Sequence, residues 1–573
     1  MQPRRSERGN RGVPATRYDE VYVSHLSLHD LGVPSRHFGD ALMASATTST
    51  DDAPATYTDA ICGPDAVKWK AAIESELQSL KENVVYEIVD RPKNRKVIGS
   101  RWVLRVTRGA DGEIEKFKAR VVAKGYSQRE GIDYNETFSP TVRFESLRAL
   151  FALAASQGME MQQMDVTTAF LYAEIDGEVY MEMPEGMVQE GKVLKLLKSI
   201  YGLKQASRLW NIHLDAVLGK MEFQKLTADF GVYVMGEGPN RTYLALYVDD
   251  LMLLNKLMDA IAKVKGLLGE QFKMKDLGEV KFMLVLEVRR RDNGDILLCQ
   301  ERYTRDVLAK FRMEDSRPAS TPLDPGLKLS VVDAPETVEE IQKMEKYPYK
   351  QALGSLLYIS GGSRPDIAAA VNTLCRFSQK PGLKHWEGVL RIMRYLKGTL
   401  GEGILYRRGV CTDFIGYVDA SHHTCPDTMR GRAGYVFMSA GGAISWQSKF
   451  VGNDTLSSCE TEYLALAMAA QEASFLGQLQ FEMKGGEFAT NEVERSVIVL
   501  RTDSESAKAL VENPIYHSRT KHILAKYHFI RDRVAEGEIV LEWVKSEMNG
   551  ADMMTKHASV GVQKTNKMLI GMV

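Results

Sequence analysis

Hydrophobic and polar positions alternate with two different periods along this chain. From Asp65 onward apolar residues recur at helical intervals, at Trp69, Ile73, Leu77 and Leu80. The runs on either side of a Gly-Ala-Asp-Gly segment (109–112) are β-patterned and predict a hairpin. A Leu- and Ala-rich helix is predicted over residues 146–158. This part of the chain therefore predicts helices mixed with antiparallel strands.

The stretch 242–254 contains two apolar runs around Tyr247-Val248-Asp249-Asp250. The pattern predicts a buried strand, a tight turn and a second buried strand. Adjacent strand residues point to opposite faces, so only a turn lets both acids reach one site. Carboxylates this close repel each other, and a divalent metal is the usual remedy. The residues alone leave two interpretations open, a metal site and an exposed hairpin turn.

Strand periodicity returns after Asp413. Strands are predicted over residues 414–420 and 433–449, and helices and a further strand near residue 500 follow. Strands followed by mixed helices and strands indicate a separate α/β domain. Residues 300–410 alternate helices with proline-containing joints and contain no cluster of catalytic residue types, which predicts a connecting segment.

Composition is that of an ordinary globular protein with several domains. The chain has 573 residues, of which 44% are apolar and 26% are charged. A chain of this length is expected to form roughly three to five domains. Lys and Arg number 74 against 75 Asp and Glu, so net charge does not indicate a nucleic-acid binder, and the basic residues are judged by location.

Six scattered cysteines without a CxxC pair favour a reducing compartment and argue against a zinc knuckle. No run reaches the roughly 18 apolar residues of a membrane span, and the N-terminus lacks the apolar core of a signal peptide. We therefore expect a soluble, intracellular protein with no membrane partner.

Basic residues gather in two places. Residues 1–60 begin with several arginines and end in a stretch rich in Ser, Thr, Ala and Asp, which predicts a disordered arm or linker. The second strand of the predicted hairpin carries basic residues on one face: Lys116, Lys118, Arg120 and Lys124. Such a face suits contact with a triphosphate or a phosphate backbone, and it equally suits a solvated strand.

Several motifs in order carry a resemblance. The segments KARVVAKGYSQ, ETFSPTVRFESLR, QMDVTTAFLYAEI, SIYGLKQASRLW and YVDDLML occur in the order and spacing of copia-type retrotransposon reverse transcriptases. Farther on, YPYKQALGSLLYI, GYVDAS, AISWQSKF, LSSCETEY and RTKHI resemble the connection and ribonuclease H parts of the same Pol polyproteins. The resemblance covers residues 65–560, and no aspartic-protease or integrase-core sequence is recognisable.

The resemblance implies an α+β multidomain fold, with a right-hand polymerase, a connection segment and an α/β ribonuclease H-like domain. The expected limits are 1–60 for the arm or linker, 61–256 for fingers and palm, 257–330 for a thumb-like region, 331–410 for the connection, 411–560 for the ribonuclease H-like domain and 561–573 for a tail.

The resemblance also implies the chemistry of the acidic turn. Asp165, on a neighbouring palm strand, would face Asp249 and Asp250. These carboxylates would hold two Mg²⁺ ions, with Mn²⁺ as a substitute, for joining a primer 3′-hydroxyl to a nucleotide. Asp165 and Asp249 would bridge the ions, whereas Asp250 would act less directly, through charge and positioning.

Further matching positions imply contacts with the substrate. Phe170 would lie under the incoming sugar and exclude a ribose 2′-hydroxyl, and a core aromatic is the alternative. The other expected contacts are two cations at the triphosphate, two residues of the nucleotide-contacting segment and two residues at the primer end: Lys118, Arg120, Gln205, Arg208, Tyr247 and Val248.

In the C-terminal part the resemblance implies a second site, which would hold two Mg²⁺ ions and direct water at RNA paired with DNA. The expected ligands are Asp419, Glu462, Asp503 and Asp552. Glu460 competes with Glu462, and the tyrosine that follows favours Glu462. His522 and His528 would assist product release, with packing or phosphate contact as the alternative.

The chain departs from the family pattern at a few positions. Pro is usual at Ser207, Lys or Asn near Thr167, and Gly at Val285. A β-branched residue in place of Gly crowds a close backbone approach. The segment around Val285 resembles the strands that lead to the thumb and primer grip, so primer handling is the function affected.

The sequence thus favours an RNA-directed DNA polymerase with ribonuclease H activity. Expected partners are an RNA template, a DNA primer, the RNA–DNA hybrid, dNTPs and other element-encoded proteins such as integrase and capsid. The expected location is the cytoplasm, in a virus-like particle, with access to the nucleus. The alternatives are an inactive domesticated or decaying product that binds nucleic acid or protein, and a DNA-templated or RNA-making polymerase.

Overall fold

The fold is given by a computed structural model that describes residues 53–108, 114–452, 455, 457–486, 495–513 and 528–573. Most of the predicted arm, 1–60, lies outside these residues, and its end contributes to helix α3 (Tyr57–Cys62). No helix among the described residues is long and apolar enough to span a bilayer.

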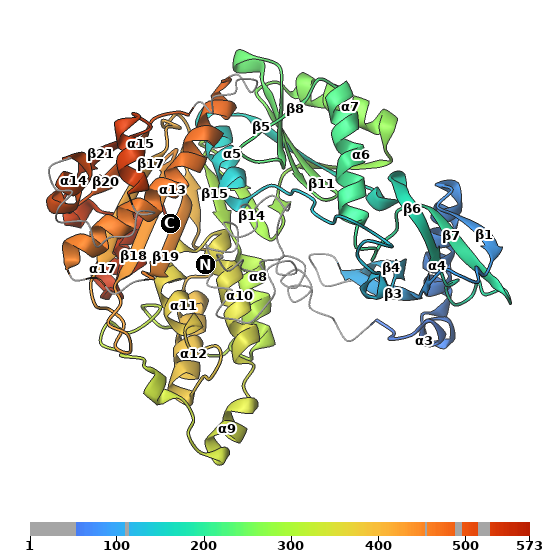
Figure 1. Ribbon diagram of the computed structural model, residues 1–573, viewed down its shortest axis with the longest axis horizontal. Coiled ribbons are helices and arrows are strands. Elements are labelled where there is room, and N and C mark those ends of the chain that lie inside the picture. Colours follow the sequence, from blue (N-terminus) through green and yellow to red (C-terminus); the bar gives the residue numbers. More distant parts are fainter. Residues whose placement is uncertain (1–52, 109–113, 453–454, 456, 487–494, 514–527) are drawn as a thin grey trace, which may run out of the picture.

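The N-terminal lobe consists of one long helix and two small sheets (Figure 1). Helix α4 (Ala66–Glu82) buries Trp69, Ile73 and Leu80, as their helical spacing predicts. Strands β3 (Ser100–Arg108) and β4 (Ile114–Ala123) pair antiparallel as the predicted hairpin, whose turn lies outside the described residues. The other sheet has the order β1 (Tyr86–Asp90), β7 (Lys192–Lys198), β6 (Glu174–Met181), β2 (Val97–Ile98).

A six-stranded sheet forms the centre of the polypeptide. Its order is β12 (Met274–Glu279), β5 (Glu160–Val166), β11 (Asp250–Asn255), β10 (Thr242–Tyr247), β9 (Val232–Met235), β8 (Gln224–Lys225). Alternate residues of β11 enter two different cores. Leu251 and Leu253 pack with α6 (Ala206–Lys220) and α7 (Met258–Gln271), whereas Met252 and Leu254 share a core with α5 (Phe144–Gln157). Burial on both faces explains the continuous apolar runs around the acidic turn.

Residues 282–406 link the central sheet to the C-terminal part. Their sheet has the order β13 (Phe282–Met283), β14 (Leu286–Arg290), β15 (Ile296–Cys299), β16 (Ile404–Tyr406). The β15–β16 pairing joins the predicted thumb-like region to the end of the predicted connection. The main helices here are α8 (Glu301–Lys310), α10 (Tyr349–Gly362), α11 (Ala368–Cys375) and α12 (Leu383–Gly398), which enclose a second core, and α9 (Val338–Glu345) projects from them (Figure 1).

The C-terminal domain has a five-stranded sheet. Its order is β19 (Gly442–Phe450), β18 (Arg432–Ser439), β17 (Ile415–Ser421), β20 (Ile498–Thr502), β21 (Ile539–Trp543). The first three strands pair antiparallel and the last two pair parallel, so strands come first and mixed α/β follows, as the pattern predicts. Its helices are α13 (Ser458–Lys484), α14 (Glu505–Glu512), α15 (Phe529–Ala535), α16 (Asp552–Thr555) and α17 (Val560–Leu569).

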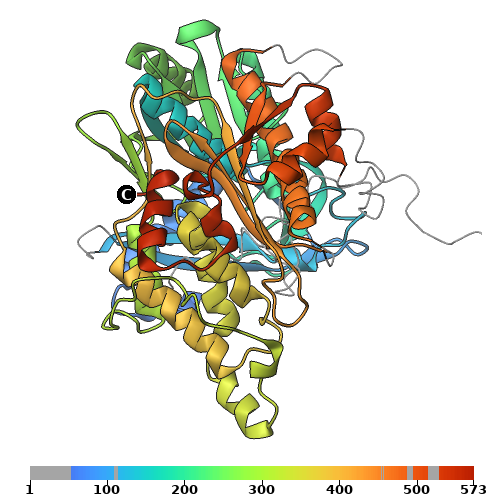
Figure 2. The same cartoon turned by 90° about the vertical axis from the view of Figure 1, so that its left-hand side faces the viewer.

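The predicted tail, 561–573, is instead part of the packed fold. Most of it forms α17, and Ile570 and Met572 are buried because they pack into the large core. The backbone of Val573 exchanges two hydrogen bonds of 3.1 Å with Gly403, beside β16. Figure 2 shows the C-terminal helices (red) between the strands of the C-terminal sheet (orange) and the linking helices (yellow).

One hydrophobic core joins the central sheet to the C-terminal domain. It contains residues of α5, such as Leu150, together with Trp446 of β19 and Leu466 of α13. At its edge the side chain of Arg148, 1% exposed, donates to the carbonyl oxygens of Ile444 (2.6 Å) and Gly361 (2.6 Å). The two parts are therefore packed as a single body.

Candidate active sites

The acidic turn has the geometry that its sequence pattern predicts. Tyr247 and Asp250 are the last paired residues of the β10–β11 hairpin, and Val248-Asp249 forms a two-residue turn between them. Val248 has φ +59°, a left-handed conformation that such tight turns require. Asp250 is the register partner of Asp165 on β5, so their side chains share one face of the sheet. The structure thus brings Asp165, Asp249 and Asp250 to one edge of the central sheet.

Three hydrogen bonds fix the turn. The indole Nε1 of Trp210, on α6, donates to the Val248 carbonyl oxygen (2.6 Å). The backbone nitrogen of Val166 donates to the Asp249 carbonyl oxygen (2.9 Å). The side-chain amide of Gln163 donates to Asp250 Oδ1 (2.7 Å), which orients that carboxylate. The backbone of the turn is held by neighbouring elements rather than left in solvent.

Burial and repulsion by neighbouring carboxylates make Asp249 and Asp250 costly to ionise. Burial raises the pKa of Asp250 to about 7; the charges of Asp249 and Asp165 add to the effect, and the Gln163 hydrogen bond opposes it. Burial also raises the pKa of Asp249, and so does the charge of Asp165. Hard oxygen donors whose charges repel are the donor set that a divalent cation such as Mg²⁺ neutralises. The residues present therefore fit a divalent cation.

Two cations of β4 lie within electrostatic reach of the turn. The charges of Arg120 and Lys118 lower the pKa of Asp249, in opposition to burial. Burial and the charge of Arg120 lower the pKa of Lys118, whereas Asp165 and Asp249 raise it. The hairpin of the N-terminal lobe thus directs positive charge at the acids of the turn.

Phe170 and Arg120 both contact the ring of Tyr201. Phe170 is half-buried on a short 3₁₀ helix (Ala169–Tyr172) that follows β5, and its ring meets the ring of Tyr201 edge-on at 5.1 Å between centroids. Tyr247 is half-buried at the end of β10. Tyr247 thus adjoins the acidic turn, and the substrate contacts of both side chains stay predictions.

Gln205 and Arg208 have partners within the protein. The Gln205 amide is 2% exposed; it accepts from Gln128 (3.1 Å) and donates to the Asp133 carbonyl oxygen (3.1 Å). Arg208 Nη1 donates to the Phe138 carbonyl oxygen (3.4 Å). Both side chains support the segment 128–138, so any nucleotide contact by Gln205 must be made through that segment or after it moves.

A second group of acids lies in the C-terminal domain. Asp419 is within β17, Glu462 is in the first turns of α13, and Asp503 directly follows β20. Ligand oxygens of these carboxylates all lie within 4.8 Å of one another, the only such group of acids, histidines or cysteines among the described residues. Glu462 rather than its competitor Glu460 joins the group. The acids of the turn are spaced more widely.

The electrostatics of this cluster also fit a divalent cation. Burial raises the pKa of Glu462 to about 9, with added repulsion from Asp419 and Asp503. Burial raises the pKa of Asp419 to about 6. Glu462 Oε2 is buried without a hydrogen-bond partner among the described residues. A buried carboxylate oxygen without a hydrogen-bond donor, on a residue close to two other carboxylates, fits a cation as its partner.

Asp552, the fourth predicted ligand, reaches the cluster through Lys556. Asp552 begins α16, and its Oδ1 lies 2.5 Å from the Lys556 ammonium nitrogen, which is 3.6 Å from Asp419 Oδ2. Burial opposes the charge on Lys556, but Asp419 and Asp552 raise its pKa above the ordinary value. The ammonium group therefore stands as a cation between these two carboxylates.

Of the two predicted histidines, His528 lies among the described residues and His522 does not. His528 Nδ1 lies 2.8 Å from the hydroxyl of Tyr463, on α13, next to Glu462 in the sequence. His522 falls in residues 514–527, outside the described part of the chain.

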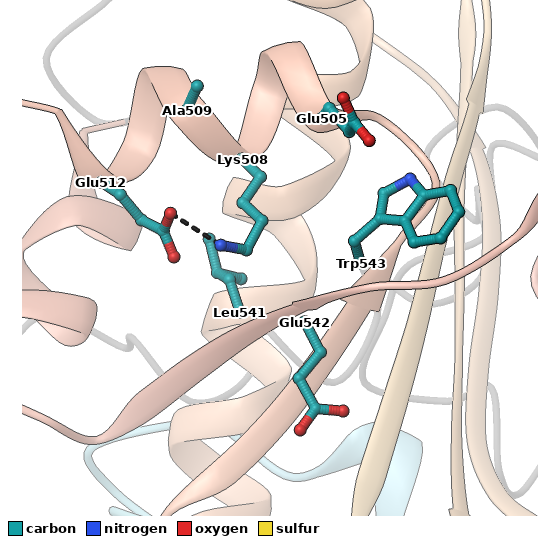
Figure 3. A pocket seen from close by; sticks show the side chains of 7 residues that line it. All are labelled: Glu505, Lys508, Ala509, Glu512, Leu541, Glu542 and Trp543. Carbon is teal, nitrogen blue, oxygen red and sulfur yellow. Dashed lines mark hydrogen bonds and ion pairs between the residues drawn. The ribbon is translucent and has the colours of Figure 1, made fainter.

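A hollow on the outer side of the cluster does not contain its acids. This pocket, about 550 Å³, lies between α14 and β21, and Lys508 in it pairs with Glu512 (2.8 Å; Figure 3). The indole of Trp543 lines it and donates to the Asp503 carbonyl oxygen (3.3 Å). Through Trp543 the wall of the pocket contacts the backbone of Asp503.

Sequence reasoning missed several side chains that hold the acids or the turn, among them Gln163, Lys556 and Trp210. Gln163 lies two residues before Asp165, on the same face of β5, and Lys556 lies one helical turn after Asp552, so both spacings contained a signal. Trp210 is distant from the turn in sequence, and no local pattern indicates its hydrogen bond to Val248.

Comparisons with known proteins agree on one family. The family model described as "Reverse transcriptase (RNA-dependent DNA polymerase)" matches residues 83–325. The retrovirus-related Pol polyprotein from transposon TNT 1-94 of Nicotiana tabacum is 39% identical over 529 residues, covering 91% of this chain and 39% of that protein. The corresponding protein from transposon RE1 of Arabidopsis thaliana is 33% identical, covering 86% and 33%.

A shorter relative is covered completely. The transposon Ty5-1 protein of Saccharomyces cerevisiae is 33% identical over 313 residues, which are 54% of this chain and 100% of the relative. The chain spans well under half the length of the two Pol polyproteins. With the acidic turn inside the matched region, the chain belongs to the reverse transcriptase family of copia-type retrotransposon Pol polyproteins.

Proposed function

We propose that this chain copies RNA into DNA with one active site and degrades the RNA of the resulting hybrid with a second. In this proposal the N-terminal lobe is the fingers, the central sheet is the palm, and the C-terminal domain is a ribonuclease H. The observation that carries the proposal is the presence of two separate acidic sites on one packed chain, one at the Asp249-Asp250 turn and one around Glu462.

At the polymerase site Asp165 and Asp249 would hold two Mg²⁺ ions. These ions would neutralise negative charge on the triphosphate and lower the pKa of the primer 3′-hydroxyl. The hydrogen bond from Gln163 fixes the orientation of the Asp250 carboxylate. Asp250 would add negative charge beside the two metal ligands. Lys118 and Arg120 neutralise the triphosphate from the fingers side. Phe170 closes the space beside the sugar, so that a deoxynucleotide is accepted and a ribonucleotide is not.

At the nuclease site Asp419, Glu462 and Asp503 would hold two Mg²⁺ ions, which supply an activated water. Lys556 holds Asp552 next to Asp419 and limits the repulsion between them. His528, hydrogen-bonded to Tyr463, is available to exchange a proton near the cluster.

The partners follow from this chemistry: an RNA template, a DNA primer, their hybrid and dNTPs, read through backbone and helical shape because a replicating enzyme must accept any sequence. Intact acids at both sites count against an inactive remnant that only binds nucleic acid. Action within a virus-like particle, beside integrase and capsid, completes the proposal.

The test is Mg²⁺-dependent dTTP incorporation on poly(rA)/oligo(dT) by the parent and Asp249→Asn. Loss of an outer-shell partner of a metal costs about 10–100-fold, so loss of a ligand should lower the rate by at least about 100-fold. Asp259→Asn, which changes an exposed acid on the helix α7 packed against the central sheet, is the matched control and should keep the parental rate. No incorporation by folded parent protein that binds the hybrid would favour the inactive remnant.

A further inference from the structure

Tyr201 contacts both Arg120 and Phe170. In the proposed polymerase Arg120 contacts the triphosphate of the nucleotide and Phe170 contacts its sugar. The guanidinium carbon of Arg120 lies 4.4 Å from the centroid of the Tyr201 ring. The Phe170 ring meets the same ring edge-on, with 5.1 Å between centroids and 71° between planes. Arg120 comes from the fingers hairpin and Phe170 from the palm. Tyr201 is thus the shared platform of a triphosphate contact and a sugar contact.

The backbone around Tyr201 is clamped to the fingers hairpin. The nitrogen of Ala123, at the end of β4, donates to the Tyr201 carbonyl oxygen (2.8 Å). Gly202 has φ +89°, and a Cβ there would lie 2.2 Å from the Ala123 carbonyl oxygen. A Cβ on Gly125 would likewise lie 2.0 Å from the Gly202 carbonyl oxygen. Such close approach leaves Tyr201 little freedom relative to β4.

The ring, not the hydroxyl, makes these contacts. The hydroxyl oxygen of Tyr201 is buried and has no hydrogen-bond partner among the described residues. Burial raises the pKa of this phenol to about 12, and the charges of Asp249 and Asp165 also raise it, whereas Arg120 opposes them. The phenol is therefore neutral and lies within reach of the charges of the catalytic acids.

Resting on the proposed function, we propose that Tyr201 is a positioning residue for sugar selection. Its ring holds Phe170 against movement away from the sugar and holds Arg120 by a cation–π contact at the triphosphate. A gate that excludes one hydroxyl group must be fixed to within a fraction of an ångström. Without the Tyr201 ring, Phe170 has space to retreat, and the ribose 2′-hydroxyl fits.

The test compares kcat/KM for dTTP and for UTP on poly(rA)/oligo(dT). Tyr201→Leu should lower the dTTP-to-UTP ratio by about 10-fold or more, since a pocket selects against an added hydroxyl by up to about 100-fold. Tyr201→Phe, which keeps the ring, should retain the parental ratio. Tyr86→Leu is the control, because it removes a half-buried tyrosine from β1 of the same lobe, whose hydroxyl contacts Met187, and it should leave the ratio unchanged.

If the parent extends the primer, two results would overturn the role of Tyr201. One is a parental dTTP-to-UTP ratio in folded Tyr201→Leu, and the other is an equal decrease of that ratio in Tyr86→Leu. A parent that extends no primer would overturn the proposed function and this role together. If Tyr201→Leu does not fold, Tyr201→Met replaces it, because it retains most of the side-chain volume. It should lower the dTTP-to-UTP ratio in the same way, and a parental ratio would contradict the proposal.

Discussion

Two carboxylates of the C-terminal cluster share one ammonium group. Lys556 lies 2.5 Å from Asp552 and 3.6 Å from Asp419, and their charges raise its pKa although burial opposes them. Lys556→Met should slow cleavage of RNA in a hybrid by about 10–100-fold, the usual cost of losing a residue that orients a ligand. Primer extension should not change, because the acidic turn is elsewhere.

The control for Lys556→Met is Lys564→Met, an exposed lysine on α17. Hybrid cleavage is followed with an RNA strand labelled at its 5′ end. Parental cleavage by Lys556→Met would mean that Asp552 and Asp419 do not need this cation.

The raised pKa values predict how the stability of the metal-free protein depends on pH. Burial raises the pKa of Asp419 to about 6, of Asp250 to about 7 and of Glu462 to about 9, against about 4 in the unfolded chain. Between about pH 4 and the raised pKa of each acid, the folded protein therefore binds more protons than the unfolded chain. Its stability falls as the pH rises across that range, up to about pH 9 for Glu462.

With EDTA the unfolding temperature should thus decrease from pH 6 to pH 9. Mg²⁺ binds the ionised carboxylates, so it should raise the unfolding temperature more at pH 9 than at pH 6. Glu462→Gln should make the decrease in EDTA less steep. Equal stabilisation by Mg²⁺ at both pH values would contradict the assignment of these acids as ligands.

At the scale of elements, the junction of β4 with the turn before α6 joins the N-terminal lobe to the part of the chain that covers the central sheet. Gly202→Ala puts a Cβ 2.2 Å from a backbone oxygen at φ +89°, where an L-residue already costs roughly 1–2 kcal/mol. We expect the variant to lose at least that much stability and to incorporate dNTP more slowly. Gly177→Ala, in β6 of the same lobe with no atom within 4 Å of the new Cβ, should lose neither.

Chemical denaturation of both glycine variants measures the difference. Parental stability and incorporation in Gly202→Ala would show that β4 and the turn move apart without cost.

Local sequence patterns predicted elements well and their partners poorly. The apolar runs around Asp249 predicted the hairpin because each strand is buried on both faces. The pairing of β5 with β11 depends on tertiary register, so Asp165 could be named only through the family resemblance. The pattern of 561–573 likewise does not indicate that these residues pair beside β16 and pack into the large core.

Val285, where the family usually has Gly, lies in a tight turn of the structure. In the two-residue turn between β13 and β14 the left-handed conformation falls on Leu284, φ +61°, and Val285 packs against the core of the linking helices. The sequence predicted a crowded backbone at Val285, whereas in the structure its neighbour Leu284 has the left-handed conformation.

For the whole molecule, the parts proposed as polymerase and nuclease share one hydrophobic core. Arg148 of α5 donates to backbone oxygens of β19 and α10, and Glu482 of α13 accepts from the backbone nitrogens of Thr227 (3.0 Å) and Ala228 (3.1 Å), beside β9. Arg148→Met leaves several buried acceptors without donors, each costing about 1–3 kcal/mol. Both activities should then be lost at one lower temperature.

Arg302→Met, an exposed arginine on α8, is the control for that loss. Calorimetry of the parent should show polymerase and nuclease unfolding in one transition. Two separate transitions, with Arg148→Met lowering only one of them, would contradict a shared core.

The most direct test of two active sites on one chain is a single time course on a labelled RNA template with a DNA primer, Mg²⁺ and dNTPs. Asp249→Asn should cleave the RNA of the hybrid without extending the primer. Asp419→Asn should extend the primer and leave the RNA intact. Loss of both activities in either folded variant, or of neither in both, would contradict the assignment of polymerisation to the acidic turn and cleavage to the C-terminal cluster.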